Sequence, residues 1–299
     1  MTAAVEVEGL TKRFGPVTAV RDVSFRVEEG ESFGYLGPNG AGKTTTIRCL
    51  LGLVRPTAGR LQVLGHDVPA QLGAALAEVG YLPGEFGLWP NMTGEECLDY
   101  LASLHPRPPR RREELCERFE LSRADLRRQV RFYSRGMRQK VGIVQAFQHD
   151  PALAILDEPT EGLDPVMKSR FIELIEEHRR RGGTIFLSSH ILSEVEATTE
   201  RVGVLREGRL VRVGPTSDLR GDRIRHCTLV LGEPVDLAPL RALPGVSALQ
   251  PDGPVVRFEF RGEVGPLLER LTALPVRDLL VEPERLSEAF FDVYEGEGG

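Results

Sequence analysis

Short apolar runs, separated by polar, glycine-rich or proline-rich segments, dominate the first two-thirds of the chain. Three of these runs, at 33–36, 153–156 and 184–187, have the length and composition of strands buried on both faces of a parallel sheet. A glycine-rich loop follows the first run, two carboxylates end the second, and a histidine follows the third. Ligands of such sheets bind at the carboxyl ends of the strands. We therefore expect the three strand ends to share one edge of an α/β sheet.

The loop after the first run, Gly37-Pro38-Asn39-Gly40-Ala41-Gly42-Lys43-Thr44, fits the pattern G-x-x-x-x-G-K-[ST] without a mismatch. A predicted helix follows it and is closed by Gly52 and Pro56. In such a loop, backbone N–H groups cradle phosphates, the lysine reaches the β- and γ-phosphates, and the threonine binds Mg²⁺. A chance glycine turn before a lysine is the alternative, but the flanking strand and helix argue against it. We predict an ATP site formed by Asn39, Gly40, Ala41, Gly42, Lys43, Thr44 and Thr45.

Two adjacent carboxylates, Asp157 and Glu158, end the second run. We expect Asp157 to hold Mg²⁺ together with Thr44, and Glu158 to orient or deprotonate the attacking water. Two neighbouring negative charges are tolerable there because the metal and Lys43 offset them. The alternative is a strand end made acidic for solubility.

The segment Tyr133–Gln139 begins 24 residues before Asp157 and reads Tyr-Ser-Arg-Gly-Met-Arg-Gln. In that position it resembles the signature motif of ATP-binding cassette (ABC) ATPases, whose usual Leu-Ser-Gly-Gly-Gln stands here as Tyr-Ser-Arg-Gly-Met. The family's signature contacts a nucleotide held by a second cassette. The resemblance thus implies paired cassettes, with Ser134 and Gly136 completing the partner's ATP site. Ser134 is also a suitable helix N-cap, and Gly136 permits close backbone approach.

The same resemblance assigns three further residues. Asp164, in Glu-Gly-Leu-Asp, matches the loop that signals between cassettes. His190 matches the switch histidine that contacts the γ-phosphate, which makes it a catalytic candidate beside Lys43 and Glu158. Phe14 matches the aromatic residue that stacks on adenine, although from the sequence it is indistinguishable from a core phenylalanine.

Two departures from the family pattern qualify the resemblance. Gly84 stands where the family has a glutamine that senses Mg²⁺ and water. Glu85 is our candidate for a partial substitute as a metal ligand; in the alternative, backbone and water fill the gap and Glu85 faces solvent. In the signature, Arg135 and Met137 replace a glycine and a glutamine, and Arg135 either favours the phosphate or points to solvent. Both departures are similar to antibiotic exporters of the daunorubicin-resistance branch.

The expected fold is a P-loop NTPase ABC cassette over residues 1–217. The resemblance implies a RecA-like α/β core, an antiparallel β subdomain with strands near 6–10 and 24–27, and a helical subdomain at about 90–145. Residues 224–282 then alternate strand and helix signals in the order βαββαβ, which matches a small ferredoxin-like α+β domain over 218–299. A terminal helix is predicted at 284–294. This domain carries no catalytic motif. We expect a structural, dimer-stabilising role for it, and ligand sensing is the alternative.

A partner surface is predicted at the loop 86–92, where Phe86, Leu88, Trp89 and Met92 lie among glycine and proline. Such groups are enriched at interfaces, and the equivalent family loop receives a coupling helix of a membrane subunit; local core is the alternative. The arginine-rich stretch at 107–112 faces either anionic lipid or acidic partner loops, or simply solvent.

Composition narrows the functional class. No apolar run of the 299-residue chain reaches the roughly 20 residues that span a bilayer. The four cysteines show no C-x-x-C pairing, and the net charge of −6 gives no reason to expect nucleic acid as a partner. We expect the ATPase subunit of an exporter, bound to the cytoplasmic face of the membrane through a separate multi-span subunit. A soluble ABC ATPase acting on DNA or the ribosome, and an importer ATPase, are the alternatives. The resemblance implies that the membrane subunit, and not this chain, recognises the transported substrate.

Overall fold

The computed structural model describes residues 2–219 and 224–283. Contacts between residues divide the chain into two compact units, Met1–Gly214 and Pro215–Gly299. The helix predicted at 284–294 lies outside the described residues. Within the described ranges, no helix combines the length and apolar character needed to cross a bilayer.

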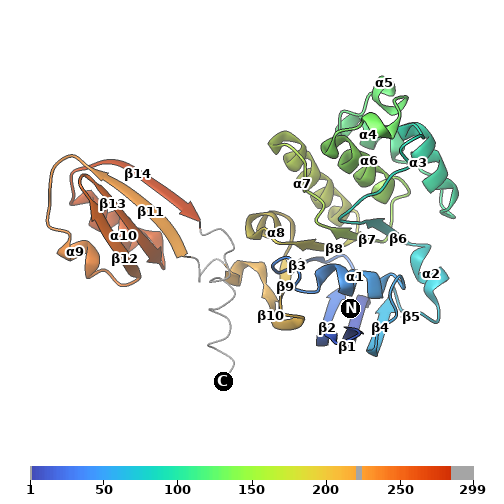
Figure 1. Cartoon of the computed structure of the whole chain (residues 1–299), viewed down its shortest axis with the longest axis horizontal. Coiled ribbons are helices and arrows are strands. Elements are labelled where there is room, and N and C mark those ends of the chain that lie inside the picture. The colour runs from blue at the N-terminus through green and yellow to red at the C-terminus, as the bar shows by residue number, and fades with distance from the viewer. Residues whose placement is uncertain (1, 220–223, 284–299) are drawn as a thin grey trace. The chain divides into compact units, whose positions relative to one another are not determined.

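A six-stranded sheet forms the centre of the first unit (Figure 1). In spatial order its strands are β10 (Arg209–Pro215), β9 (Arg201–Arg206), β3 (Ser32–Leu36), β8 (Thr184–Ser189), β7 (Leu153–Asp157) and β6 (Val79–Leu82). The strands from β9 to β6 run parallel. Every residue of β3, β7 and β8 is buried, which explains their uninterrupted apolar runs.

The register of this sheet brings the three predicted strand ends together. Leu36 pairs with Ser189, and Asp157 pairs with Ser188. Helices follow these strands in the chain: α1 (Lys43–Leu50) after β3, α7 (Pro165–Arg180) after β7, and α8 (Leu192–Thr198) after β8. The connecting segments therefore lie at one edge of the sheet, as the sequence predicts.

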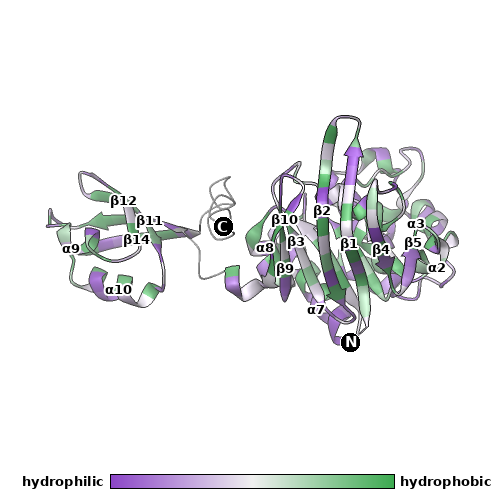
Figure 2. Cartoon of the chain, turned by 90° about the horizontal axis from the view of Figure 1, so that it is seen from below, coloured by the Kyte–Doolittle hydropathy of each residue, from purple (hydrophilic) through white to green (hydrophobic). Residues whose placement is uncertain are grey.

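A four-stranded sheet, in the order β2 (Val17–Glu28), β1 (Ala3–Phe14), β4 (Ala58–Val63) and β5 (His66–Val68), packs against the core. Its long strands β1 and β2 have 12 residues each, so the strands expected at 6–10 and 24–27 were too short. Register shifts interrupt their pairing, one of them beside Gly9 with φ 60°. A register shift interrupts the alternation of apolar and polar residues, so a prediction from alternation alone underestimates the length of the strand. Figure 2 shows apolar and polar residues intermixed along β1 and β2.

Aromatic rings join the two sheets. The ring of Phe25 on β2 stacks on Phe33 of β3 at 5.6 Å and on Phe186 of β8 at 5.7 Å between centroids. All three side chains are buried. Because stacked pairs of this kind add to the free energy gained from burial, the cluster fixes one sheet against the other.

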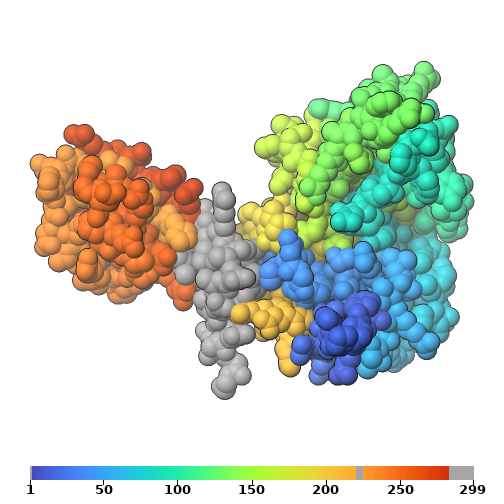
Figure 3. Space-filling model, viewed as in Figure 1, coloured from blue at the N-terminus to red at the C-terminus, as the bar shows by residue number. Residues whose placement is uncertain are grey.

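The helices predicted between about 90 and 145 form a lobe of the first unit, coloured teal to green in Figure 3. They are α3 (Gly94–Ser103), α4 (Arg112–Arg118), α5 (Arg123–Leu126) and α6 (Arg135–Phe147), with the short 3₁₀ turn η1 (Val130–Phe132) before α6. Helix α2 (Leu72–Leu76) precedes this lobe. Capping boxes start two of the helices, with Thr93 and Glu96 at α3, and Ser122 and Asp125 at α5.

The arginine-rich stretch forms internal ion pairs, which neither interpretation of the sequence included. Arg107 pairs with Glu78, which precedes β6. Buried Arg111 reaches Glu177 of α7 over 2.5 Å. These two arginines hold the helical lobe to the core rather than facing lipid or solvent alone.

The second unit has the predicted βαββαβ order. Its elements are β11 (Ile224–Leu231), α9 (Ala238–Arg241), β12 (Val246–Asp252), β13 (Val255–Arg261), α10 (Val264–Thr272) and β14 (Val276–Pro283), preceded by the 3₁₀ turn η2 (Thr216–Leu219). The strands pair antiparallel in the order β12-β13-β11-β14, the ferredoxin-like arrangement. Helix α9 has only four residues. Leu229, Phe258 and Phe260 belong to a separate hydrophobic core.

Candidate nucleotide-binding site

The glycine-rich loop connects β3 to α1 and leaves no room for side chains at two of its glycines. A Cβ on Gly37 would lie 2.4 Å from the carbonyl oxygen of Leu205, and one on Gly42 would lie 2.5 Å from that of Ala19. Gly42 also has φ 108° and is the N-cap of α1. Asn39 and Gly40 are exposed, so the loop presents backbone to a ligand at the start of the helix.

Lys43 is buried beneath this loop and makes three polar contacts. Its Nζ donates to the carbonyl oxygens of Gly37 over 2.7 Å and Pro38 over 3.2 Å. Glu158 Oε1 lies 3.2 Å from Nζ, an ion pair without hydrogen-bond geometry. The ammonium thus sits between the phosphate-binding loop and the carboxylate proposed as the general base.

Asp157, at the end of β7, is almost fully buried and has both carboxylate oxygens engaged. Thr44 Oγ1 donates to Oδ2 over 2.7 Å, and Ser188 Oγ donates to Oδ1 over 2.5 Å. A carboxylate beside a hydroxyl at a phosphate-binding loop is the oxygen donor set that suits Mg²⁺, which takes most of its other ligands from water and phosphate. Thr44 and Asp157 therefore fit the predicted metal site.

Ser188 is a residue that the sequence reasoning missed. It is fully buried on β8 and touches both acids, because it accepts a hydrogen bond from the backbone N–H of Glu158 over 3.3 Å as well as donating to Asp157. Its position directly after the apolar run at 184–187 gave one available signal, because a polar residue near the end of a buried strand needs a partner.

Glu158 and His190 are in direct contact. His190 Nδ1 lies 2.8 Å from Glu158 Oε2 in a hydrogen bond. The backbone of Glu158 has φ 50°, a left-handed conformation that is uncommon for a residue with a side chain. This turn directs the carboxylate between Lys43 and His190, where it is mostly buried.

Gly84 borders the predicted metal site, and Glu85 beside it is exposed. A Cβ on Gly84 would lie 3.4 Å from Asp157 Oδ2, an ordinary contact distance. Glu85 is exposed, and within the described residues it makes no hydrogen bond or ion pair. Its position corresponds to the solvent-facing alternative.

Phe14, at the end of β1, is not a core residue. Its side chain is 49% exposed, and the ammonium of Lys12 lies 4.7 Å from its ring centroid. The ring is therefore accessible to a stacking partner.

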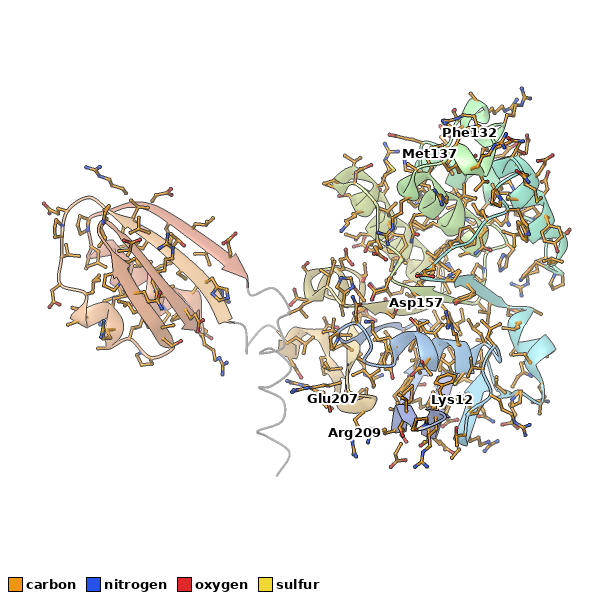
Figure 4. All side chains as sticks on the ribbon, in the orientation of Figure 1. Lys12, Phe132, Met137, Asp157, Glu207 and Arg209 are labelled. Atoms are coloured by element: carbon orange, nitrogen blue, oxygen red, sulfur yellow. The ribbon has the colours of Figure 1, made fainter. Side chains whose placement is uncertain are left out.

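The signature segment lies in the helical lobe, apart from this phosphate site. Ser134 is the N-cap of α6 and accepts from the backbone N–H of Met137 over 3.1 Å, as predicted. Figure 4 shows Met137 well removed from Asp157. Asp164 caps α7 by accepting from the backbone N–H of Met167 over 2.9 Å. Ser134 and Gly136 are consequently not part of the phosphate site of their own chain.

These features define a P-loop nucleotide-binding protein with a helical lobe. They are the phosphate loop on a parallel sheet, the hydrogen bond from Thr44 to Asp157 at the strand end, and His190 beside Glu158. Residues 20–161 match the model of the ABC transporter family. The chain is 32% identical over 251 residues to the linearmycin resistance ATP-binding protein LnrL of Bacillus subtilis, covering 81% of this chain and 80% of the relative. It belongs to the ATP-binding proteins of the ABC transporter family.

A further relative and two solved structures agree with this assignment. The bacitracin transport ATP-binding protein BcrA of Bacillus licheniformis is 37% identical, with 74% of this chain and 72% of the relative covered. The solved ATP-binding subunit of an ABC transporter is 33% identical, with a TM-score of 0.67 over 73% of this chain and 92% of its own. A bacterial ABC transporter cassette solved as a dimer shares the fold at 22% identity, with a TM-score of 0.66 over 71% of this chain and 98% of its own.

Proposed function

We propose that the chain hydrolyses ATP to drive export of an antibiotic-like or lipid-like substrate through a separate membrane subunit. The observation that carries the enzymatic part is the contact of Glu158 with both Lys43 and His190. Support for export comes from the similarity to LnrL and BcrA, whose names refer to antibiotic resistance and transport. It also comes from the signature sequence Tyr-Ser-Arg-Gly-Met.

In the proposed mechanism the glycine loop binds the phosphates and Lys43 neutralises part of their charge. A γ-phosphate competes with Glu158 for the Lys43 ammonium. Glu158, still held by His190, then accepts a proton from the attacking water. Thr44 and Asp157 would hold Mg²⁺, which would supply positive charge against the phosphates when bound. Phe14 stacks on the adenine ring.

The proposed active unit contains two cassettes. Each chain has a phosphate site at the sheet edge and a signature segment away from it, as Figure 4 shows by the separation of Met137 from Asp157. In a pair, Ser134 and Gly136 of one chain contact the nucleotide of the other, and Asp164 lies at the junction between them. ATP binding closes the pair and hydrolysis reopens it.

The proposed contact with the membrane subunit lies between the core and the helical lobe. A groove of about 400 Å³ is lined there mainly by apolar side chains, including Leu53, Phe86 and Leu104. Beside it, Trp89 is 42% exposed and meets Tyr100 of α3 edge-on at 4.9 Å. Leu88, in contrast, is buried and supports the loop from below. An amphipathic helix of the membrane subunit fits such a groove.

Co-purification tests the transport role. We expect the tagged chain, expressed in its native host, to be recovered with a multi-span membrane protein and to hydrolyse ATP in that complex. Trp89→Ala should weaken recovery and coupling, while Leu268→Ala, at an exposed leucine of the second unit, should leave both unchanged. Recovery with ribosomes or DNA in place of a membrane protein would overturn the transport proposal. A chain with no ATPase activity in any of these complexes would overturn the enzymatic one.

A further inference from the structure

Helix α6 is fastened to the loop 159–164 by contacts near its first turn. Gln139 Nε2 donates to the carbonyl oxygen of Pro159 over 2.7 Å, in a buried hydrogen bond. A Cβ on Gly136 would lie 2.8 Å from the carbonyl oxygen of Gly162, so the helix and loop backbones touch. Because the helix and the loop are packed this closely, we expect them to move together rather than to deform.

An ion pair on the surface completes the junction. The guanidinium of Arg135 pairs with the carboxylate of Glu161. The stem of Arg135 lies over Gly162, where an added Cβ would be 3.2 Å from Cγ. Gly162 has φ 81°, so the loop bends under the arginine in a conformation that favours glycine.

Arg135 does not stabilise its own helix. It is the first residue of α6, and the first turn contains no acidic residue. The amino end of a helix carries partial positive charge, which disfavours a cation at this position. Glu161 supplies the compensating negative charge from outside the helix. The pair is largely exposed, so it contributes little to folding and exchanges readily.

The loop held in this way is continuous with the catalytic carboxylate. Glu158 precedes Pro159 directly and contacts Lys43 and His190. At the other end of the loop, Asp164 caps α7. A displacement of the first turn of α6 therefore reaches Glu158 through about three residues of backbone.

We propose that Arg135 and Glu161 form a latch that transmits nucleotide docking at the signature of a chain to Glu158 of the same chain. This rests on the proposed function, in which the signature contacts the nucleotide of a second cassette. Docking there shifts the first turn of α6, the latch carries the loop with it, and Glu158 is repositioned against Lys43 and His190. Both latch residues are positioning residues, because neither touches the nucleotide of its own chain.

Steady-state ATPase assays on the full chain in its complex test this with Arg135→Gln, Glu161→Gln and the double variant. Each single variant should lower the Hill coefficient for ATP towards 1 and reduce kcat about two- to fivefold, the size of effect expected from an exposed ion pair. The double variant should be no worse than either single one. Arg135→Lys, which keeps the charge, should recover most of the cooperativity.

The matched control is Glu120→Gln, which removes an exposed ion pair to Arg170 outside this loop and should change neither parameter. An effect of Arg135→Gln without one of Glu161→Gln would overturn the latch and indicate direct contact with the partner's phosphate. Additive effects in the double variant, or unchanged cooperativity in both single variants, would overturn it as well. A wild-type complex without ATPase activity would instead refute the proposed function.

Discussion

The two units of the chain treat polar side chains differently. The first buries Lys43, Asp157 and Ser188 beside one another at a sheet edge. In the second, the buried side chains between residues 225 and 282 are apolar residues and Cys227. Burying polar groups costs free energy unless each has a partner, and proteins accept that cost chiefly where chemistry requires it. The contrast is consistent with the proposed site in the first unit, and we propose a structural role for the described part of the second.

The strongest test of this contrast removes the proposed base. Glu158→Gln should reduce ATP hydrolysis about 10²- to 10⁴-fold, the usual contribution of a positioned base, and should leave ATP binding nearly unchanged. Phosphate release and equilibrium nucleotide binding measure the two effects. Glu173→Gln, at an exposed position of α7, is the control. Residual hydrolysis above a tenth of wild type would mean that another group activates the water.

Disrupting the hydrophobic core of the second unit should reduce stability and leave ATP hydrolysis nearly unchanged. Phe258→Ala removes a buried aromatic side chain and should destabilise the second unit by about 3–4 kcal/mol. Hydrolysis should stay within about twofold of wild type, since the phosphate site shares no core residue with it. Differential scanning calorimetry with a parallel ATPase assay would show this. A large loss of hydrolysis at temperatures where the first unit is folded would contradict the division of roles.

Acid should affect the first unit through two buried histidines. Burial lowers the pKa of His149, which also stacks against His105, to about 4, and it lowers the pKa of His178 to about 4, from an ordinary 6.5. The unfolded chain then binds protons that the folded chain does not, so stability is complete above pH 6.5 and falls as the pH drops towards 4. The loss is at most about 3 kcal/mol for each histidine.

Denaturant unfolding at pH 7.5, 6 and 5 measures this loss. His178→Leu should flatten the pH dependence, because it removes one of the two titrating groups. Within the described residues neither ring nitrogen of His178 has a hydrogen-bond partner, so the substitution breaks no hydrogen bond. An unchanged slope in that variant would show that other groups cause the acid sensitivity.

The smallest expected effect concerns Gly84. Gly84→Gln restores the side chain usual in the family, and its Cβ would lie 3.4 Å from Asp157 Oδ2, an ordinary contact that places the new side chain beside the predicted metal site. We expect an increase in hydrolysis of about fivefold, equivalent to one additional hydrogen bond in the site. Gly73→Gln, at a glycine of α2 where an added Cβ would meet open space, is the control. Slower hydrolysis in Gly84→Gln would show that the glycine itself is required.

Local order along the chain was sufficient to predict the elements that form the candidate site, because strand, loop and helix follow one another within a few residues. The phosphate loop, the acidic strand end and the N-cap at Ser134 are all local features of this kind. Contacts between distant segments were not predictable. Ser188 meets Asp157 across the sheet, and Gln139 meets Pro159 across a loop, over separations of 31 and 20 residues.

The ion pairs of the arginine-rich stretch were likewise not predictable from the sequence. The sequence shows only the nearby acids as partners for these arginines, so solvent or lipid was the natural expectation for the rest. Arg111 does pair with Glu114, three residues on, but Glu78 and Glu177 come from segments far along the chain. The lengths of β1 and β2 were missed because a bulge resets the alternation of apolar residues.

The left-handed backbone at Glu158 has a consequence for how this site tolerates change. Such a conformation costs a residue with a Cβ about 1 kcal/mol or more, whereas glycine adopts it freely. Glu158→Gly would therefore be expected to raise the melting temperature of the first unit while abolishing hydrolysis. A screen for thermostability alone would favour that substitution, so stabilised variants of this chain must be selected with turnover as a second criterion.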